Sequence, residues 1–256
     1  MILRRITEHV KAQNWFAVAI DFLIVVVGVF IGLQVQEWSK HREERQREMQ
    51  IVADLLADLD IDRSQYANGL AIDAHRVSAA NASLKGAALA PIEFNWEKSA
   101  SDNVDYSFDT SAVAEYPASR LDRLWTDVVI GFHPTPSTAT FDAMVGAGDI
   151  KIFRDRQIVR ELQTYHNLTE SVLAQNEKLL AIRGKVLNIG ASSGLAPYSR
   201  MPAADYFQLV AGNPQLAATI RIMATFAIYH HGELQTADAR AAGLQVRLND
   251  YLATMR

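Results

Sequence analysis

The residue types best suited to chemistry lie between Tyr229 and Glu233, where the sequence reads YHHGE. Neutral imidazole is a good ligand for transition metals, and histidine changes its charge near neutral pH. His230 and Glu233 are one helical turn apart, and His166 lies on another predicted helix, so the three could form a metal site or a proton-linked site. The sequence lacks the E-x-x-H and H-E-x-x-H patterns of helical metal sites. We therefore favour a core histidine that is satisfied by one hydrogen bond.

Two short motifs resemble functional loops but lack their context. Residues 190–194, GASSG, match the G-x-S-x-G nucleophile pattern with Ser192 at the centre, yet they follow a long predicted helix instead of a strand. Gly190 is better explained as the C-cap of that helix. Residues 58–63, DLDIDR, resemble the start of a calcium loop, but Arg63 stands where the loop needs glycine. We expect these acids on the exposed side of a helix, with no catalytic residue.

The composition excludes several classes of protein. The 256 residues include no cysteine, which excludes disulfides, thiolate metal sites and cysteine nucleophiles. The net charge is −4, so no overall basic character indicates a nucleic-acid partner. His75 and His133 have no obvious partners in the sequence. The favoured interpretation is therefore a protein that is not an enzyme and has no cofactor.

One element is predicted strongly, a transmembrane helix near the N-terminus. Of the twenty residues from Phe16 to Val35, fourteen are Leu, Ile, Val or Phe. As a helix they span ~30 Å, the thickness of a bilayer core, and the fourteen contribute about −4 to −8 kcal/mol to insertion. Asp21 costs at most about 3.5 kcal/mol on the same scale. Trp15 and Trp38 bracket the run, which suits side chains that anchor at the two membrane interfaces.

Two alternatives to a membrane span fit the sequence less well. A cleaved signal peptide has a shorter apolar region that ends in an A-x-A-like site, whereas this run continues into LQVQEWSKHREER. A buried core helix of a soluble protein would also be apolar. The length of the run and the bracketing tryptophans favour the span over both.

One face of this helix combines an acid with small residues. Asp21, Val25, Gly28 and Gly32 are spaced by four, three and four, so they lie on the same side. The two glycines form a small-xxx-small pair that lets membrane helices approach closely, and an ionisable group in a span usually faces protein or water. These residues therefore predict a helix–helix contact with a second copy or with another membrane protein. The alternative, an aspartate near the interface that reaches headgroup water, stays open.

The rest of the chain is predicted to be all-α. Periodic apolar residues favour a stalk-like helix over 39–90, and Pro91 closes it. Residues 91–119 contain six acids and one lysine without periodicity, as expected of a contact surface or a plain connector. The stalk stripe consists of Val52, Leu55, Leu59, Tyr66, Leu70, Val77 and Leu84.

Residues 120–256 are predicted to form an antiparallel helical bundle against the stalk helix. Apolar residues recur every seven positions between Ile158 and Val186, and again from Ile220 to Met255. Asn213 before Pro214 is a good helix start. Residues 149–153, DIKIF, could be extended. The predicted organisation is thus 1–38 for the tail and the membrane helix, 39–90 for the stalk, 91–119 for the acidic loop and 120–256 for the bundle.

The charges flanking the span are nearly balanced and leave its orientation open. Arg4, Arg5 and Lys11 precede it, and four basic residues follow it within ten positions. We expect a short cytoplasmic N-terminus and a large periplasmic domain, partly because the chain has no cytoplasmic catalytic motif.

The region 14–45 resembles the N-terminal signature of a bacterial family of uncharacterised single-span membrane proteins. In that family an acidic residue precedes an apolar run that ends in G-x-x-x-x-L-Q-x-x-x-W. A second likeness lies in residues 137–167, and together the two cover about a quarter of the chain. The resemblance implies a membrane-anchored helical domain with no catalytic residues to carry over, and we expect the span to lie in a bacterial inner membrane. The signature is matched by Asp21, Gly28, Leu33, Gln34 and Trp38.

Two functional hypotheses follow from the sequence. The first is a membrane-anchored scaffold or accessory protein that contacts the lipid bilayer and assembles through its span and its bundle. The second is a sensory module that binds a small ligand or a metal in the bundle, where His166, His230 and Glu233 are the candidate residues.

Overall fold

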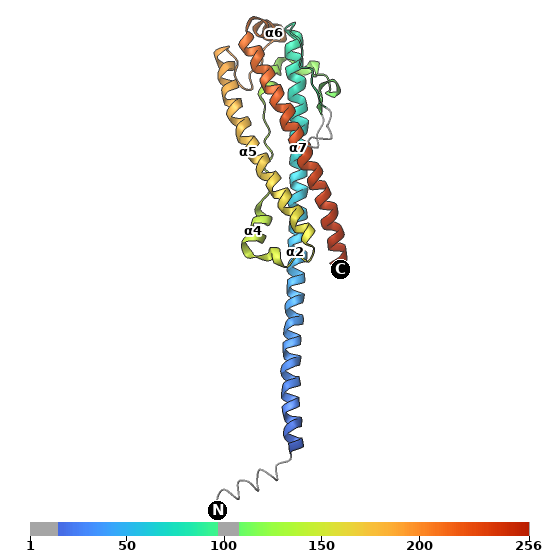
Figure 1. Cartoon of the computed structure of the whole chain (residues 1–256). Helices are drawn as coiled ribbons and strands as arrows, with labels where there is room; N and C mark the ends of the chain where they lie inside the picture. Colours follow the sequence, from blue (N-terminus) through green and yellow to red (C-terminus); the bar gives the residue numbers. More distant parts are fainter. Residues whose placement is uncertain (1–14, 97–107, 256) are drawn as a thin grey trace, which may run out of the picture. The chain divides into compact units, whose positions relative to one another are not determined.

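The computed structural model describes residues 15–96 and 108–255, and these residues form an all-α fold. The chain divides into two units, Met1–Gln50 and Ile51–Arg256, each of which is described by itself. Helix α2, Trp15–Gly86, begins in the first unit and continues in the second (Figure 1). The predicted helical class is confirmed.

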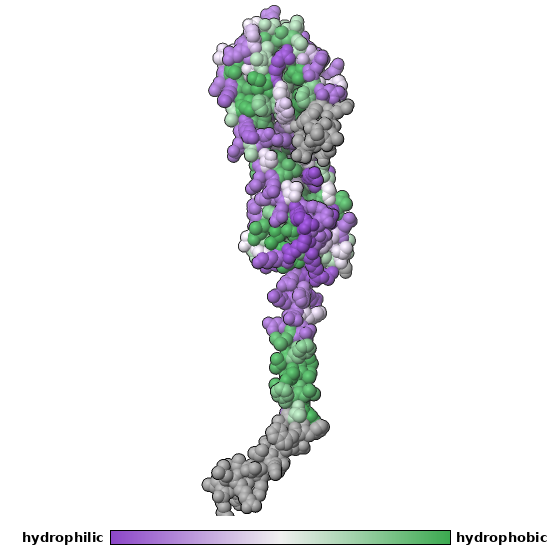
Figure 2. All heavy atoms as spheres, in the orientation of Figure 1, coloured by the Kyte–Doolittle hydropathy of each residue, from purple (hydrophilic) through white to green (hydrophobic). Residues whose placement is uncertain are grey.

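The described part of the first unit, residues 15–50, is helical, and its side chains from residue 19 to 38 are exposed. One segment near the N-terminus is long and apolar enough to cross a membrane, and none of its most apolar window is buried. Figure 2 shows these side chains as a continuous apolar band followed by polar residues. Arg42 lies over the ring of Trp38, 5.7 Å from its centroid. The side chain of Trp15 lies outside the described residues.

The second unit is built from three long helices: the part of α2 after Gln50, α5 (Arg156–Ser192) and α7 (Pro214–Met255). The predicted stalk stripe is buried except for Leu70, which is partly buried. Pairs of contacts show the helix directions (Figure 1). α7 runs antiparallel to α2, because Gln245 bonds to Asp60 and His230 to Asp73. α7 also runs antiparallel to α5, because Arg247 pairs with Glu161 and Glu233 with Gln175, so α2 and α5 run parallel.

Shorter elements connect these helices. Two two-residue strands, β1 and β2, pair antiparallel, with Asn95 opposite Asp109 and Trp96 opposite Phe108. The residues between the strands, 97–107, lie outside the described part of the chain, so only the ends of the predicted acidic loop are described. The short elements are β1 Asn95–Trp96, β2 Phe108–Asp109, η1 Thr110–Ala112, η2 Ala118–Arg123, α3 Leu124–Val129, α4 Ala139–Ala147, η3 Asp149–Lys151 and α6 Ala203–Gly212.

Residues 130–138, here called the strap, cross the bundle without regular secondary structure. Because α2 and α5 are parallel, the chain must return along the bundle between them, and the strap covers part of that distance. Pro134 and Pro136 suit an extended segment because proline cannot donate a backbone hydrogen bond and disfavours helix in the residue before it. Gly69 makes room for the strap, since a Cβ there would collide with Leu234 and press on Pro134.

Several local predictions were wrong. The stalk helix ends at Gly86, before Pro91, and Ala88 adopts a left-handed φ of 58°. Residues 149–151 form a 3-10 helix instead of an extended segment. Gly190 is not a C-cap, because α5 continues to Ser192. Gly190 instead lets the ring of Trp125 lie directly against the helix backbone.

The predicted start of the last helix was confirmed. The Asn213 side chain accepts the Leu216 amide at 3.0 Å, as a helix N-cap does, so α7 begins where the sequence predicts. Gly148 ends α4 in the left-handed conformation, with φ of 77°.

The second unit has two separate apolar cores. The first surrounds Tyr66 and includes Val52, Ile158 and Leu248, and we call it the Tyr66 core. The other surrounds Val77 and includes Trp125 and Ile220, and we call it the Val77 core. The side chains that divide them are polar.

Candidate functional site

A layer of buried polar side chains lies between the two apolar cores. On α2 it falls between Tyr66 and Val77, and on α7 between Ile228 and Leu234. Charged groups are seldom buried completely unless they are paired, so this layer is the most unusual feature of the bundle. At its centre are three residues that we call the central cluster: Asp73, Arg76 and His230.

The central cluster is a buried charge network. The carboxylate of Asp73 lies 2.6 Å from Nδ1 of His230 with one oxygen, and accepts a hydrogen bond from Arg76 Nη1 at 3.0 Å with the other. Their side chains are 1 to 3% exposed. Arg76 also donates through Nε and Nη2 to the carbonyl of Ile130, the first residue of the strap. Burial lowers the pKa of the Arg76 guanidinium, and the Asp73 charge opposes that shift.

His133, on the strap, faces this cluster. Both of its ring nitrogens are buried and have no hydrogen-bond partner in the part of the chain that the structure describes. Burial lowers the pKa of His133, and the nearby His230, Arg76 and Arg183 lower it further, while Asp73 opposes them. Neutral imidazole is thus favoured at this position. Nε2 of His230 is likewise buried and lacks a partner among the described residues.

Side chains of α2 and α5 hold the backbone of the strap. Gln65 binds both backbone groups of Thr135, accepting its amide at 2.7 Å and donating to its carbonyl at 3.2 Å. Asn176 donates to the Pro134 carbonyl at 2.6 Å, and Asp62 accepts the Ser137 amide at 2.8 Å. These bonds satisfy backbone groups of the buried Pro134, the partly buried Ser137 and the exposed Thr135, which have no partner in a helix or sheet. The strap is therefore specified by side chains and not by a helix or sheet of its own.

The candidate ligand residues from the sequence do not form one site. His166 stacks on Phe141, with ring centroids 4.4 Å apart, and lies 3.6 Å from Glu170. Glu233 accepts a hydrogen bond from Gln175 at 2.8 Å, and burial raises its pKa. His230 pairs with Asp73 as described. Among residues 15–96 and 108–255 no group of three or more His, Cys, Asp or Glu side chains could hold a metal ion.

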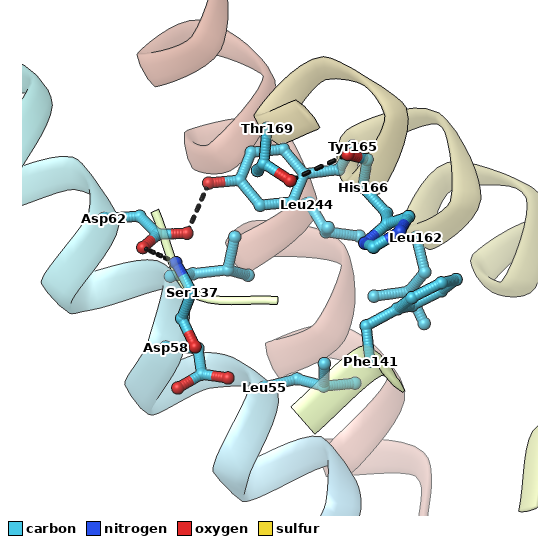
Figure 3. A pocket seen from close by; sticks show the side chains of 11 residues that line it. Leu55, Asp58, Asp62, Ser137, Phe141, Leu162, Tyr165, His166, Thr169 and Leu244 are labelled. Carbon is cyan, nitrogen blue, oxygen red and sulfur yellow. Dashed lines mark hydrogen bonds between the residues drawn. The ribbon is translucent and has the colours of Figure 1, made fainter. Parts of the chain in front are cut away.

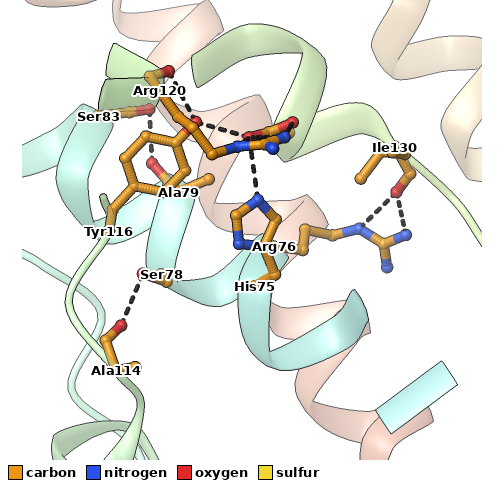
Figure 4. Close-up of polar contacts among 10 residues, drawn as sticks. His75, Arg76, Ser78, Ala79, Ser83, Ala114, Tyr116, Arg120 and Ile130 are labelled. Carbon is orange, nitrogen blue, oxygen red and sulfur yellow. Dashed lines mark hydrogen bonds and ion pairs between the residues drawn. The ribbon is translucent and has the colours of Figure 1, made fainter. Parts of the chain in front are cut away.

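A second polar network, which we call the lateral cluster, joins Asp127 to His75, Tyr116 and Arg120 (Figure 4). Asp127 accepts hydrogen bonds from Tyr116 at 2.6 Å and from Arg120 Nε and Nη2 at 2.9 Å, and lies 2.9 Å from His75 Nε2. Burial alone would raise the pKa of Asp127, but these bonds hold it below its usual value. The expectation that His75 has no partner was wrong.

A small cavity lies beside the C-terminal end of the strap, where Ser137 lines it (Figure 3). Asp62 accepts a hydrogen bond from the Tyr165 hydroxyl at 2.8 Å, and the Tyr66 hydroxyl lies 3.2 Å from that of Tyr165. Burial raises the pKa of Asp62. The space open to the centre of a water molecule is about 20 Å³, enough for about one water. Asp62 is completely buried, so the prediction that residues 58–63 place their acids on an exposed helix side was wrong for it.

The other motif has no catalytic neighbour that the structure describes. Ser192 is exposed, and its hydroxyl donates to the Ile189 carbonyl at 2.8 Å, as a serine in the last turn of a helix does.

The predicted helix-contact residues all lie on the exposed part of α2. Val25 is 63% exposed, Asp21 is exposed, and a Cβ at Gly28 or Gly32 would meet nothing within 4 Å. Trp38 is 64% exposed. No residue among 15–96 and 108–255 covers that face, and the predicted contact with a second copy or another membrane protein stays a prediction.

Sequence reasoning missed most of the central layer. Asp73, Arg76 and His133 gave no recognisable signal, although polar residues at the stalk positions between Leu70 and Val77 interrupt an otherwise apolar stripe. No family model matches this chain, and comparison with the curated proteins and with the solved structures found no match.

Proposed function

We propose that this chain is a single-pass membrane-anchored scaffold or accessory protein without catalytic activity, and that it assembles through its apolar helix and its helical bundle. The observation that supports the anchor most directly is the exposed run of large apolar side chains on α2, from Ile20 to Val35. Exposed apolar patches of this length are rare on monomeric soluble proteins and are ordinary on membrane spans.

The helix face with Asp21, Gly28 and Gly32 supports assembly. A buried acid in a membrane is stabilised by facing protein or water, and two glycines one turn apart allow backbones to pack closely. The partner is a second copy of this chain or another membrane protein. The likeness to the bacterial single-span family supports this proposal, and we propose a bacterial inner membrane as the location of the anchor.

The test is crosslinking of the full chain in membranes. Asp21→Asn, Gly28→Leu and Gly32→Leu should each reduce the crosslinked dimer several-fold. Val26→Leu is the matched control, because it adds bulk on the opposite side of the same helix and should leave the dimer unchanged. Unchanged crosslinking in all three variants would reject self-association through this face, and loss of a crosslink to a different protein would identify a hetero-partner.

We also propose that the bundle is periplasmic. Because the chain has no cysteine, a single cysteine can report its side of the membrane. Leu180 on α5 is 48% exposed, so Leu180→Cys should react with a membrane-impermeant maleimide in intact cells. Reaction only after lysis would place the bundle in the cytoplasm.

A sensory role is the second candidate. It is favoured by the central layer, where Nε2 of His230 and both nitrogens of His133 are buried and have no partner in the described chain. A saturable rise in melting temperature with a metabolite or with Zn²⁺, lost in His230→Ala, would support that role over the scaffold.

A further inference from the structure

We propose that the strap is an acid-operated latch, in which a proton taken up by His133 releases residues 130–138 from the side chains of α2 and α5 that hold them. The inference goes beyond the anchor and the scaffold, and does not depend on either. It rests on how the strap is fastened and on what surrounds this one side chain.

The latch has two sets of fastenings with His133 between them. On one side, Arg76 donates to the Ile130 carbonyl and Arg183 donates to the Val129 carbonyl at 2.8 Å. On the other side, Asn176, Gln65 and Asp62 hold Pro134, Thr135 and Ser137. The bonds to residues 134–137 all come from side chains of α2 and α5, so this part of the strap can leave without breaking a backbone hydrogen bond. The two ends of the strap stay tied to the flanking helices, because the Ile130 amide donates to the Thr126 carbonyl and the Asp142 amide donates to the Thr138 carbonyl.

The surroundings of His133 accept a neutral ring and oppose a charged one. A protonated imidazole has two N–H donors and needs two acceptors. Neither nitrogen has one among the described residues, and both are shielded from solvent. His133 as a whole is partly buried, but a charge on a ring whose two nitrogens are shielded and unpaired is costly.

Charged groups on three helices act on His133. They are Asp73 and Arg76 on α2, Arg183 on α5 and His230 on α7, and only Asp73 favours a positive ring. Since Asp73 is already bonded to Arg76 and His230, it is not free to pair with a second cation. The positive charges of Arg76 and Arg183 also oppose the binding of a metal ion at His133.

The expected response follows from proton linkage. If the released His133 has an ordinary pKa of about 6.5 and the seated ring resists protonation, the opening equilibrium rises about tenfold at pH 5.5. At pH 7.5 the ring is neutral in both states, and the strap stays closed.

The test is hydrogen exchange of peptides that cover the strap, in the full chain in detergent, corrected for the intrinsic exchange rate at each pH. The wild-type amides of Thr135 and Ser137 should lose about tenfold in protection between pH 7.5 and pH 5.5. His133→Gln, which cannot be protonated, should show no loss. His41→Gln, a matched change of an exposed histidine, should behave as wild type.

Two further variants decide the remaining cases. His133→Arg is always charged and should open the strap at pH 7.5; if it fails to fold, the decision rests on His133→Gln. An unchanged wild-type protection at pH 5.5 would overturn the latch. An equal loss of protection in His133→Gln would also overturn it. So would a loss of protection that His230→Gln abolishes and His133→Gln does not, because the proton would then act at the central cluster.

Discussion

The bundle contains two networks in which an aspartate bonds to a histidine and an arginine, and they differ in how much water reaches them. The aspartate is 1% exposed in both. In the lateral cluster its histidine is 31% exposed and its arginine 40%, whereas in the central cluster the corresponding values are 2% and 3%. The same side chains are thus placed at a surface in one case and between two cores in the other.

This difference decides what each network can tolerate. When one side chain of the lateral cluster is removed, water can replace part of the hydrogen bonding that it supplied. In the central cluster water has little access, so each charge depends on its neighbours. The lateral cluster satisfies its aspartate with four protein contacts, while the central one leaves Nε2 of His230 without a partner among the described residues.

The largest expected effect is that of Asp73→Asn. It leaves Arg76 buried without a counter-charge, so unfolding in urea, followed by circular dichroism of the full chain in detergent, should show a loss of about 3–5 kcal/mol. The double variant Asp73→Leu with Arg76→Met removes both charges and should recover most of that loss. A loss below about 1 kcal/mol in the single variant would contradict the assigned burial of this network.

Asp127→Asn should cost less, about 2 kcal/mol, in the same measurement. It weakens charge-assisted hydrogen bonds, but Arg120 and His75 can turn to solvent. A loss equal to that of Asp73→Asn would show that exposure does not separate the two clusters.

The two regions should also respond to acid in different pH ranges. His133 has a lowered pKa when folded, so the unfolded chain binds the proton more readily and stability falls as the pH drops below about 6.5. The loss at pH 5.5 is at most about 1.4 kcal/mol, the value for a folded ring that takes up no proton. Asp127 also has a lowered pKa, but its ordinary value is 3.8, so its contribution is present above that pH and is lost as the pH falls through its lower folded value.

Stability curves against pH separate these contributions. Between pH 7.5 and 5.5, the free energy of unfolding of Asp127→Asn should fall in parallel with that of the wild type. The free energy of unfolding of His133→Gln should fall by less than either. Asp62 and Glu233 have raised pKa values and act in the opposite sense, stabilising the fold as the pH falls, but both are present in all three chains. A steeper fall in His133→Gln than in the wild type would contradict the assignment.

The comparison also shows what the sequence can reveal. Regular spacing predicted the three long helices, because each buries one apolar stripe along its length. It could not predict the polar layer, since Asp73 and His230 are 157 residues apart and their pairing depends on how two helices align. The strap was missed for the same reason, because its fastenings come from distant helices and leave no local pattern. His230 was identified as a core histidine with one hydrogen bond, and that interpretation is confirmed.

The smallest expected effect separates the two histidines. His75→Gln should cost about 0.5–1 kcal/mol, because Asp127 keeps its bonds to Tyr116 and Arg120 and the lost group was partly exposed. His230→Gln should cost about 1–3 kcal/mol, since one oxygen of Asp73 then loses its ring partner in a region that water does not reach. Urea unfolding of both variants at pH 7.5 measures the difference. If the two losses were equal, the histidines would contribute alike despite their burial, and only the aspartates and arginines would distinguish the central cluster from the lateral one.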